Sequence, residues 1–152
     1  MKDIMFDTNI FNEILDGKIS LQEIQGTTAK FWITHLQYDE LNSTKNEDRR
    51  NGLLKTFQQI DQTVVPTESA VFDISVWDQA KWTSQDNLYE PILNELNTRQ
   101  PGRTRSHTRD ALIAETAIKN KCLFVSNDKT LYSIVEQFKG EVCTLEELKV
   151  LI

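Results

Sequence analysis

The chain has 152 residues, a formal net charge of −6, and a composition that is 39% hydrophobic and 26% charged. This length is typical of one domain with a substantial core, and the apolar content excludes a disordered chain, a collagen and a coiled coil. No apolar run approaches the roughly 20 residues of a membrane helix, and the first residues lack the apolar segment of a signal peptide. We therefore expect one cytoplasmic domain spanning residues 1–152.

The acidic balance and the cysteines limit the function further. A net negative charge argues against a strongly basic nucleic-acid binder, but an enzyme acting on nucleic acid needs acids of its own to hold a metal. Cys122 and Cys143 lie in apolar, strand-like sequence without a CxxC or Cys/His metal spacing, which predicts buried thiols. The only histidines are His35 and His107, so a metal site in this chain must use oxygen ligands.

Short apolar strands alternate with helices along the chain. In order, we expect a strand over 2–6, helices over 10–15 and 20–24, a strand over 31–34, helices over 35–41 and 47–60, a strand over 63–65, helices over 75–82 and 87–96, a polar loop over 98–109, a helix over 110–119, a strand over 122–126, a helix over 129–138, a strand over 141–143 and a helix over 145–151. This alternation predicts an α/β fold with three layers, α/β/α, and a central, mainly parallel sheet.

Four acidic residues follow or approach the strands of this sheet. Asp7 comes directly after the first strand, and Asp128 lies just beyond the strand at 122–126. Glu40 lies in the early turns of the helix after the strand at 31–34, and Asp110 opens the helix that leads into the strand at 122–126. Ligands of parallel sheets collect at the carboxyl ends of the strands, so all four are expected at one edge.

Each acid alone has a simpler explanation. Asp7 could cap a helix, Asp110 could lie at the positive end of a helix dipole, Asp128 could be a turn residue, and Glu40 could face solvent. Four carboxylates at one edge repel each other unless a cation is present, and hard oxygen ligands select Mg²⁺ or Mn²⁺. These four acids are therefore candidate metal ligands and catalytic residues.

The flanking residues add support. Thr8 and Ser126 offer hydroxyls beside Asp7 and Asp128, suited to orienting the metal ligands, and we group Asn9 with them. Small side chains at Ala111, Ala114 and Ala117 let the helix of Asp110 approach the sheet closely.

Four segments resemble the acidic motifs of the PIN-domain nucleases: Phe6-Asp7-Thr8-Asn9, Tyr38-Asp39-Glu40-Leu41, Arg109-Asp110-Ala111-Leu112-Ile113-Ala114 and Val125-Ser126-Asn127-Asp128-Lys129. The resemblance implies a Mg²⁺- or Mn²⁺-dependent endonuclease, usually acting on RNA, whose metal-site carboxylates are Asp7, Glu40, Asp110 and Asp128. Ser126 stands where Thr is more usual in the family.

Small single-domain members of this family include the ribonuclease toxins of VapBC toxin–antitoxin modules. The chain resembles these VapC-like toxins in size, which implies an antitoxin partner and a homodimer. The segment 71–97 is longer and richer in Trp than is typical of a minimal toxin.

A basic segment leads into Asp110. Residues 99–109 contain four arginines, one histidine and no acid, so we expect this segment to overhang the acidic edge and contact RNA phosphates. The candidate RNA-binding residues are Arg103, Arg105, Arg109 and Lys129. We expect His35 and His107 to be incidental to the site.

Two other functions remain open. A phosphatase could use Asp7 as a nucleophile, although the Asp-x-Asp signature of such enzymes would require an acid where Asn9 stands. A PIN-like module that binds RNA or acts as a scaffold without turnover is the third interpretation, but a scaffold has no need of four converging acids.

Overall fold

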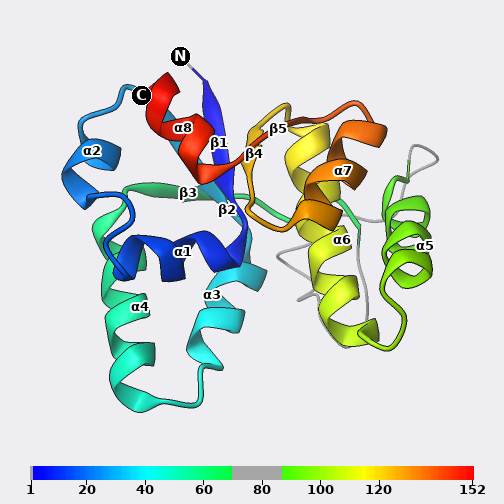
Figure 1. Cartoon of the computed structure of the whole chain (residues 1–152), viewed down its shortest axis with the longest axis horizontal. Helices are drawn as coiled ribbons and strands as arrows, with labels where there is room; N and C mark the ends of the chain where they lie inside the picture. The colour runs from blue at the N-terminus through cyan, green and yellow to red at the C-terminus, as the bar shows by residue number, and fades with distance from the viewer. Residues whose placement is uncertain (1, 70–86) are drawn as a thin grey trace.

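The computed structural model describes residues 2–69 and 87–152. Within them, one sheet contains β1 (Asp3–Phe6), β2 (Lys30–Ile33), β3 (Gln62–Val64), β4 (Leu123–Val125) and β5 (Glu141–Cys143). The strand order is β3-β2-β1-β4-β5, and every neighbouring pair is parallel. The predicted parallel sheet is confirmed, and its strands all end at the same edge (Figure 1). The helix expected over 75–82 lies outside the described residues.

The described helices are α1 (Thr8–Leu15), α2 (Leu21–Gln25), α3 (His35–Asn42), α4 (Glu47–Gln59), α5 (Tyr89–Arg99), α6 (Thr104–Lys119), α7 (Lys129–Gln137) and α8 (Leu145–Leu151). Ser20, Thr34 and Thr144 start α2, α3 and α8 with capping boxes, which satisfy backbone N–H groups that have no partner inside the helix. Among the described residues, none of the helices combines the length and apolar character needed to cross a membrane.

Successive strand residues face two different cores. Ile4 and Phe6 pack with residues of α1, α4 and α8, whereas Met5 packs with residues of α5, α6 and α7. On β4, Phe124 joins the core of Met5, while its two neighbours in the strand face the opposite core. A sheet covered on both faces is typical of parallel strands. Figure 1 shows α1, α2 and α4 on one side of the sheet and α5, α6 and α7 on the other, so the three-layer α/β/α prediction is confirmed.

The polar loop predicted over 98–109 is mostly helical. Helix α5 continues to Arg99 and α6 starts at Thr104, so the connection is short, and Gly102 allows the reversal with a positive φ of 92°. Asp110 is therefore the seventh residue of α6, and the expectation that it opens the helix was wrong. The run of charged and polar residues before it has no apolar period, but His107 and Thr108 are buried and anchor this turn to the protein.

Candidate active site: an acidic cleft

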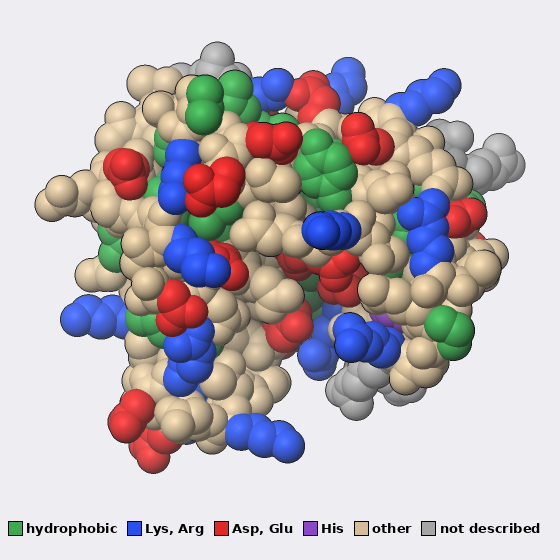
Figure 2. Space-filling model, viewed as in Figure 1, with side chains coloured by type: hydrophobic (Ala, Val, Ile, Leu, Met, Phe, Trp, Pro, Cys, Tyr) green, Lys and Arg blue, Asp and Glu red, His purple; other side chains and the backbone are tan. Residues whose placement is uncertain are grey.

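A cleft of about 80 Å³ lies at the carboxyl edge of the sheet, where β1 and β4 end. Its lining residues come from several distant parts of the chain: Asp7, Asn9, Glu40, Gln100, Arg103, Ser106, His107, Asp110 and Asp128. All four predicted carboxylates are among them. Figure 2 shows acidic side chains gathered in the hollow between the two sets of helices, with Lys and Arg side chains around it. We call this site the acidic cleft.

Asp7 joins the ends of the two central strands. Its backbone N–H donates to the carbonyl of Val125 at 2.9 Å, and its Oδ2 accepts a 2.8 Å hydrogen bond from Ser126 Oγ. Asp7 occupies the N-cap position of α1, yet its side chain makes no capping hydrogen bond. Asp7 is buried, with 5% of the residue exposed. Capping of α1 therefore does not explain why a carboxyl group is buried here.

Glu40 reaches the cleft because α3 is tied to the end of β1. The buried side chain of Gln37 donates from Nε2 to the carbonyl of Phe6 at 3.2 Å. Its Oε1 accepts from the backbone N–H of Thr34 at 2.9 Å, which fixes the start of the helix. Glu40 lies one turn further along α3 and is half-buried.

Asp110 and Asp128 belong to the helices on either side of β4 in the chain. Asp110 lies in α6, which precedes β4, and Asp128 lies at the start of α7, which follows it. The first turn of α6 contains no acid, so Asp110 does not act on the helix dipole at that end. Asp128 is the N-cap of α7, where its Oδ1 accepts from the backbone N–H groups of Thr130 and Leu131 at 2.9 and 3.1 Å. Asp128 therefore has a capping role and also contributes to the wall of the cleft.

Two of these carboxyl groups have strongly raised pKa values. Burial raises the pKa of Asp7 to about 6, and the charges of Glu40 and Asp128 act in the same direction. Burial raises the pKa of Asp110 to about 8, with the three other acids adding to the effect and Arg103 opposing it. Burial beside other acids thus disfavours the ionised forms of Asp7 and Asp110.

The chemistry of these donors fits a divalent cation that prefers oxygen. Besides the four carboxyl groups, Thr8 next to Asp7 has a buried Oγ1 with no hydrogen-bond partner in the described part of the chain. However, no three Asp, Glu, His or Cys side chains of residues 2–69 and 87–152 already form a metal-binding group. A cation of the Mg²⁺ or Mn²⁺ type would therefore have to draw the carboxylates together as it binds.

The predicted RNA-binding residues are only partly at the cleft. Arg103 is exposed and lines it. Arg109 is half-buried and Lys129 is exposed, but neither of them belongs to the lining. Arg105 lies in α6, and its side chain is outside what the structure describes. Of the predicted orienting residues, Asn9 lines the cleft and Ser126 bonds Asp7, whereas the hydroxyl of Thr8 does neither.

Sequence reasoning missed Gln100, Ser106 and His107 as cleft residues. His107 is 1% exposed, and its Nδ1 lies 3.0 Å from Asn97 Oδ1 on α5. The spacing of His107 could have indicated its place in the cleft. His107 precedes Asp110 by three residues, and residues three apart share one face of a helix. The prediction of a loop over 98–109 concealed it.

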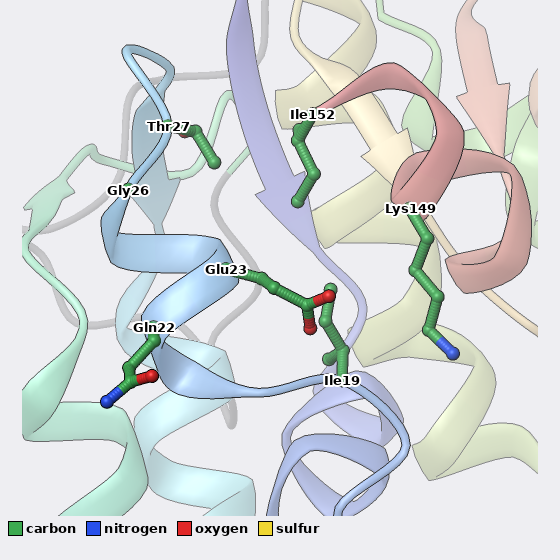
Figure 3. Close-up of a pocket in the computed structure, with 7 residues that line it drawn as sticks. All are labelled: Ile19, Gln22, Glu23, Gly26, Thr27, Lys149 and Ile152. Carbon is green, nitrogen blue, oxygen red and sulfur yellow. The ribbon is translucent and has the colours of Figure 1, made fainter.

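A second pocket, of about 190 Å³, lies between α2 and α8 (Figure 3). Its charged residues are already engaged, because Glu23 Oε2 accepts from Ser20 N–H and Oγ, and Lys149 pairs with Glu146 at 2.9 Å. It shares no residue with the acidic cleft. Nothing in its lining indicates a reaction, so the acidic cleft remains the candidate active site.

No family model and no curated protein matches the chain. Its fold is similar to a domain of a functionally unknown protein from Methanocaldococcus jannaschii DSM 2661, with a TM-score of 0.57, 14% identity and coverage of 95% of this chain and 91% of that one. It is also similar to the crystal structure of PAE2754 from Pyrobaculum aerophilum, with a TM-score of 0.53, 14% identity and coverage of 98% and 88%. FitAcB from Neisseria gonorrhoeae matches less well, with a TM-score of 0.44, 14% identity and coverage of 91% and 95%. At this identity the first two similarities establish a shared fold.

Proposed function

We propose that the acidic cleft is the active site of a divalent-cation-dependent endoribonuclease with a PIN-like fold. The observation that carries the proposal is the supply of four carboxyl groups by four separate parts of the chain to one edge of a parallel sheet. Burial, together with the charges of the neighbouring acids, raises the pKa values of Asp7 and Asp110 to about 6 and about 8, so a bound cation would favour their ionised forms. Grouping four carboxyl groups at one edge does not stabilise the fold, because the carboxylates repel each other. A metal-dependent hydrolase needs such a group to hold its cation.

The chain supplies the following groups for the reaction. Asp7, Glu40, Asp110 and Asp128 would hold one or two ions of Mg²⁺ or Mn²⁺. A bound ion of this kind polarises the scissile phosphate and lowers the pKa of water. Ser126 fixes the carboxylate of Asp7 through its hydrogen bond.

Asp110 is the carboxylate that we expect to orient the attacking water for in-line attack. Arg103, exposed at the cleft, provides positive charge for a phosphate of the substrate. The ribose 2′-hydroxyl need not attack, because water serves as the nucleophile.

The resemblance to VapBC toxins supports two protein partners. A small antitoxin would cover the acidic cleft and block access of RNA, and a second copy of the chain would form a homodimer. Light scattering of the purified protein tests the dimer. Loss of RNA cleavage on coexpression with the product of an adjacent gene tests the antitoxin.

The nuclease itself is tested by cleavage of a mixed RNA pool in Mn²⁺, Mg²⁺ or EDTA. We expect cleavage only with metal, and we expect Asp7→Asn and Asp110→Asn to abolish it. The matched control is Asp39→Asn, because Asp39 precedes Glu40 in α3 but is exposed and outside the cleft lining.

Two results would favour the alternatives. A folded protein that binds RNA but cleaves nothing in either metal would be a silent RNA-binding or scaffold module. Hydrolysis of a phosphate monoester without cleavage of RNA would identify a phosphatase.

A further inference from the structure

His107 lines the acidic cleft and has one buried ring nitrogen without a hydrogen-bond partner in the described part of the chain. Its Nδ1 lies 3.0 Å from Asn97 Oδ1, an oxygen that can only accept, so Nδ1 carries the ring proton. Its Nε2 is buried and has no hydrogen-bond partner among the residues that the structure describes. In this tautomer Nε2 carries a lone pair and no proton.

The surroundings of His107 disfavour protonation of its ring. Burial is the main cause that lowers the pKa of His107, and the positive charge of Arg103 adds to it, while Asp128 acts in the opposite direction. A neutral ring with its proton on Nδ1 leaves Nε2 as an acceptor. A buried acceptor without a donor is unfavourable, so a partner for Nε2 is expected in the working state of the cleft.

The partner of Nε2 must be a hydrogen-bond donor, and this requirement limits which ligands can occupy the cleft. When a cation is bound, the carboxyl groups of the cleft are ionised and offer only acceptors, and the phosphate of a nucleic acid likewise offers acceptors. The sugar–phosphate backbone of RNA has one donor per nucleotide, the 2′-hydroxyl, and the backbone of DNA has none inside the strand. An acceptor in a cleft that cleaves phosphodiesters can therefore distinguish the two sugars.

We propose that His107 is a specificity-determining residue whose Nε2 accepts a hydrogen bond from the 2′-hydroxyl of a ribose next to the cleaved phosphate. The proposal rests on the nuclease function above and adds a reason why the cleft acts on RNA. The position agrees with this role, because His107 lies one turn before Asp110 on the same face of α6. The hydroxyl is bound and does not react, so no covalent bond forms at His107.

The test uses an RNA that the wild-type protein cleaves, with single riboses replaced in turn by deoxyribose or 2′-O-methylribose. Binding is measured by fluorescence anisotropy in the Asp110→Asn background, where cleavage does not interfere. Loss of one hydrogen bond should weaken binding about fivefold to tenfold at one nucleotide beside the cut. His107→Phe removes the acceptor and should make the protein indifferent to the sugar at that nucleotide.

Two further variants separate recognition from folding. His107→Gln carries an oxygen near the place of Nε2 and should retain part of the ribose preference. Asn97→Ala removes the acceptor that holds the ring proton on Nδ1, so it should reduce the preference. Thermal melting confirms that each variant is folded. A ribose preference that persists in His107→Phe, or the absence of any position-specific preference in the parent protein, would overturn the proposal. A wild-type protein that neither binds nor cleaves RNA would instead overturn the nuclease function.

Discussion

The hydroxyl of Ser126 donates a 2.8 Å hydrogen bond to Asp7 Oδ2, although 119 positions separate the two residues in the chain. The same hydroxyl oxygen accepts from the backbone N–H of Asp128 at 3.1 Å, which fixes its orientation. This bond lowers the pKa of Asp7 and so partly opposes the larger effect of burial. The neighbouring ends of β1 and β4 thereby decide how readily Asp7 ionises.

Ser126→Ala should raise the pKa of Asp7 above its present value of about 6, because the bond that favours the ionised form is lost. Carbon-13 NMR titration of the aspartate carboxyl groups measures this change. Ser126→Thr keeps the hydroxyl and should leave the titration of Asp7 close to that of the wild type. An Asp7 titration unchanged by the Ala substitution would show that Ser126 has no electrostatic role.

The stability of the metal-free protein should fall between pH 6.5 and pH 8. The folded pKa of Asp110 is about 8 against an ordinary value of 3.8, so the folded protein keeps a proton that the unfolded chain has released. Stability is therefore lost as the pH rises towards 8. The lowered pKa of His107 has the opposite effect, but only below its ordinary value of 6.5. We expect the melting temperature in EDTA to drop by a few degrees over this range, and Asp110→Asn to reduce the drop; parallel curves for the two proteins would contradict the assignment.

Mg²⁺ or Mn²⁺ should raise the melting temperature at pH 8. A ligand that binds only the folded state stabilises it by about 2.7 kcal/mol at a hundredfold excess over its dissociation constant. Asp110→Asn should be more stable than the wild type without metal, since it removes repulsion, and should lose the response to metal. Asp39→Asn serves as the control and should keep the response. A wild-type protein indifferent to both ions would exclude a metal site in the cleft.

Replacement of Arg103 should weaken RNA binding and make it less sensitive to salt. Arg103→Gln removes one phosphate contact, so the slope of log affinity against log salt concentration should decrease by about one. Arg99→Gln is the matched control, because Arg99 donates to Ser133 and Gln137 and does not line the cleft. Anisotropy titrations at several salt concentrations measure both slopes. Equal slopes in the two variants would place the RNA elsewhere.

Glu115 should be important for stability because it caps α5 from within the core. Its buried Oε2 accepts from the backbone N–H groups of Leu88 and Tyr89 at 2.8 and 2.9 Å, and Lys119 lies 3.5 Å away. Glu115→Ala leaves the N–H of Leu88 unpaired and removes the carboxylate beside Lys119, although the N–H of Tyr89 keeps Asn87 Oδ1 as an acceptor at 2.8 Å, and should cost about 3 kcal/mol. Glu115→Gln still offers an oxygen and should cost less. Urea unfolding compares the two, and equal losses would argue against the capping role.

The strands could be predicted from the sequence because each is a short apolar run followed by a polar turn. Their bounds moved by only a residue or so, as at β2, which ends at Ile33 because Thr34 caps α3. Both cysteines are buried free thiols as predicted, and the alanines of α6, whose small side chains were expected to allow close packing on the sheet, are buried. The start of α6 could not be predicted, because a helix turn rich in Arg and Thr shows no apolar period until the burial of His107 is known.

The acidic residues could be assigned to one edge because sheet topology alone places them there. Their supporting contacts could not be predicted, since the bond from Gln37 to Phe6 and the capping of Thr130 by Asp128 depend on side-chain positions in three dimensions. For the same reason the sequence did not separate Arg103, which lines the cleft, from Arg109 and Lys129, which do not. Orientation about a helix axis decides between them.

The central position of β1 has a consequence for synthesis of the protein on the ribosome. This strand is the first to be made, yet its neighbour β4 ends only at Val125. Until that residue has emerged, Asp7 has neither the backbone contact to Val125 nor the hydroxyl of Ser126. The cleft is therefore assembled late, and a nascent or truncated chain lacking its last 30 or so residues has no complete set of acids.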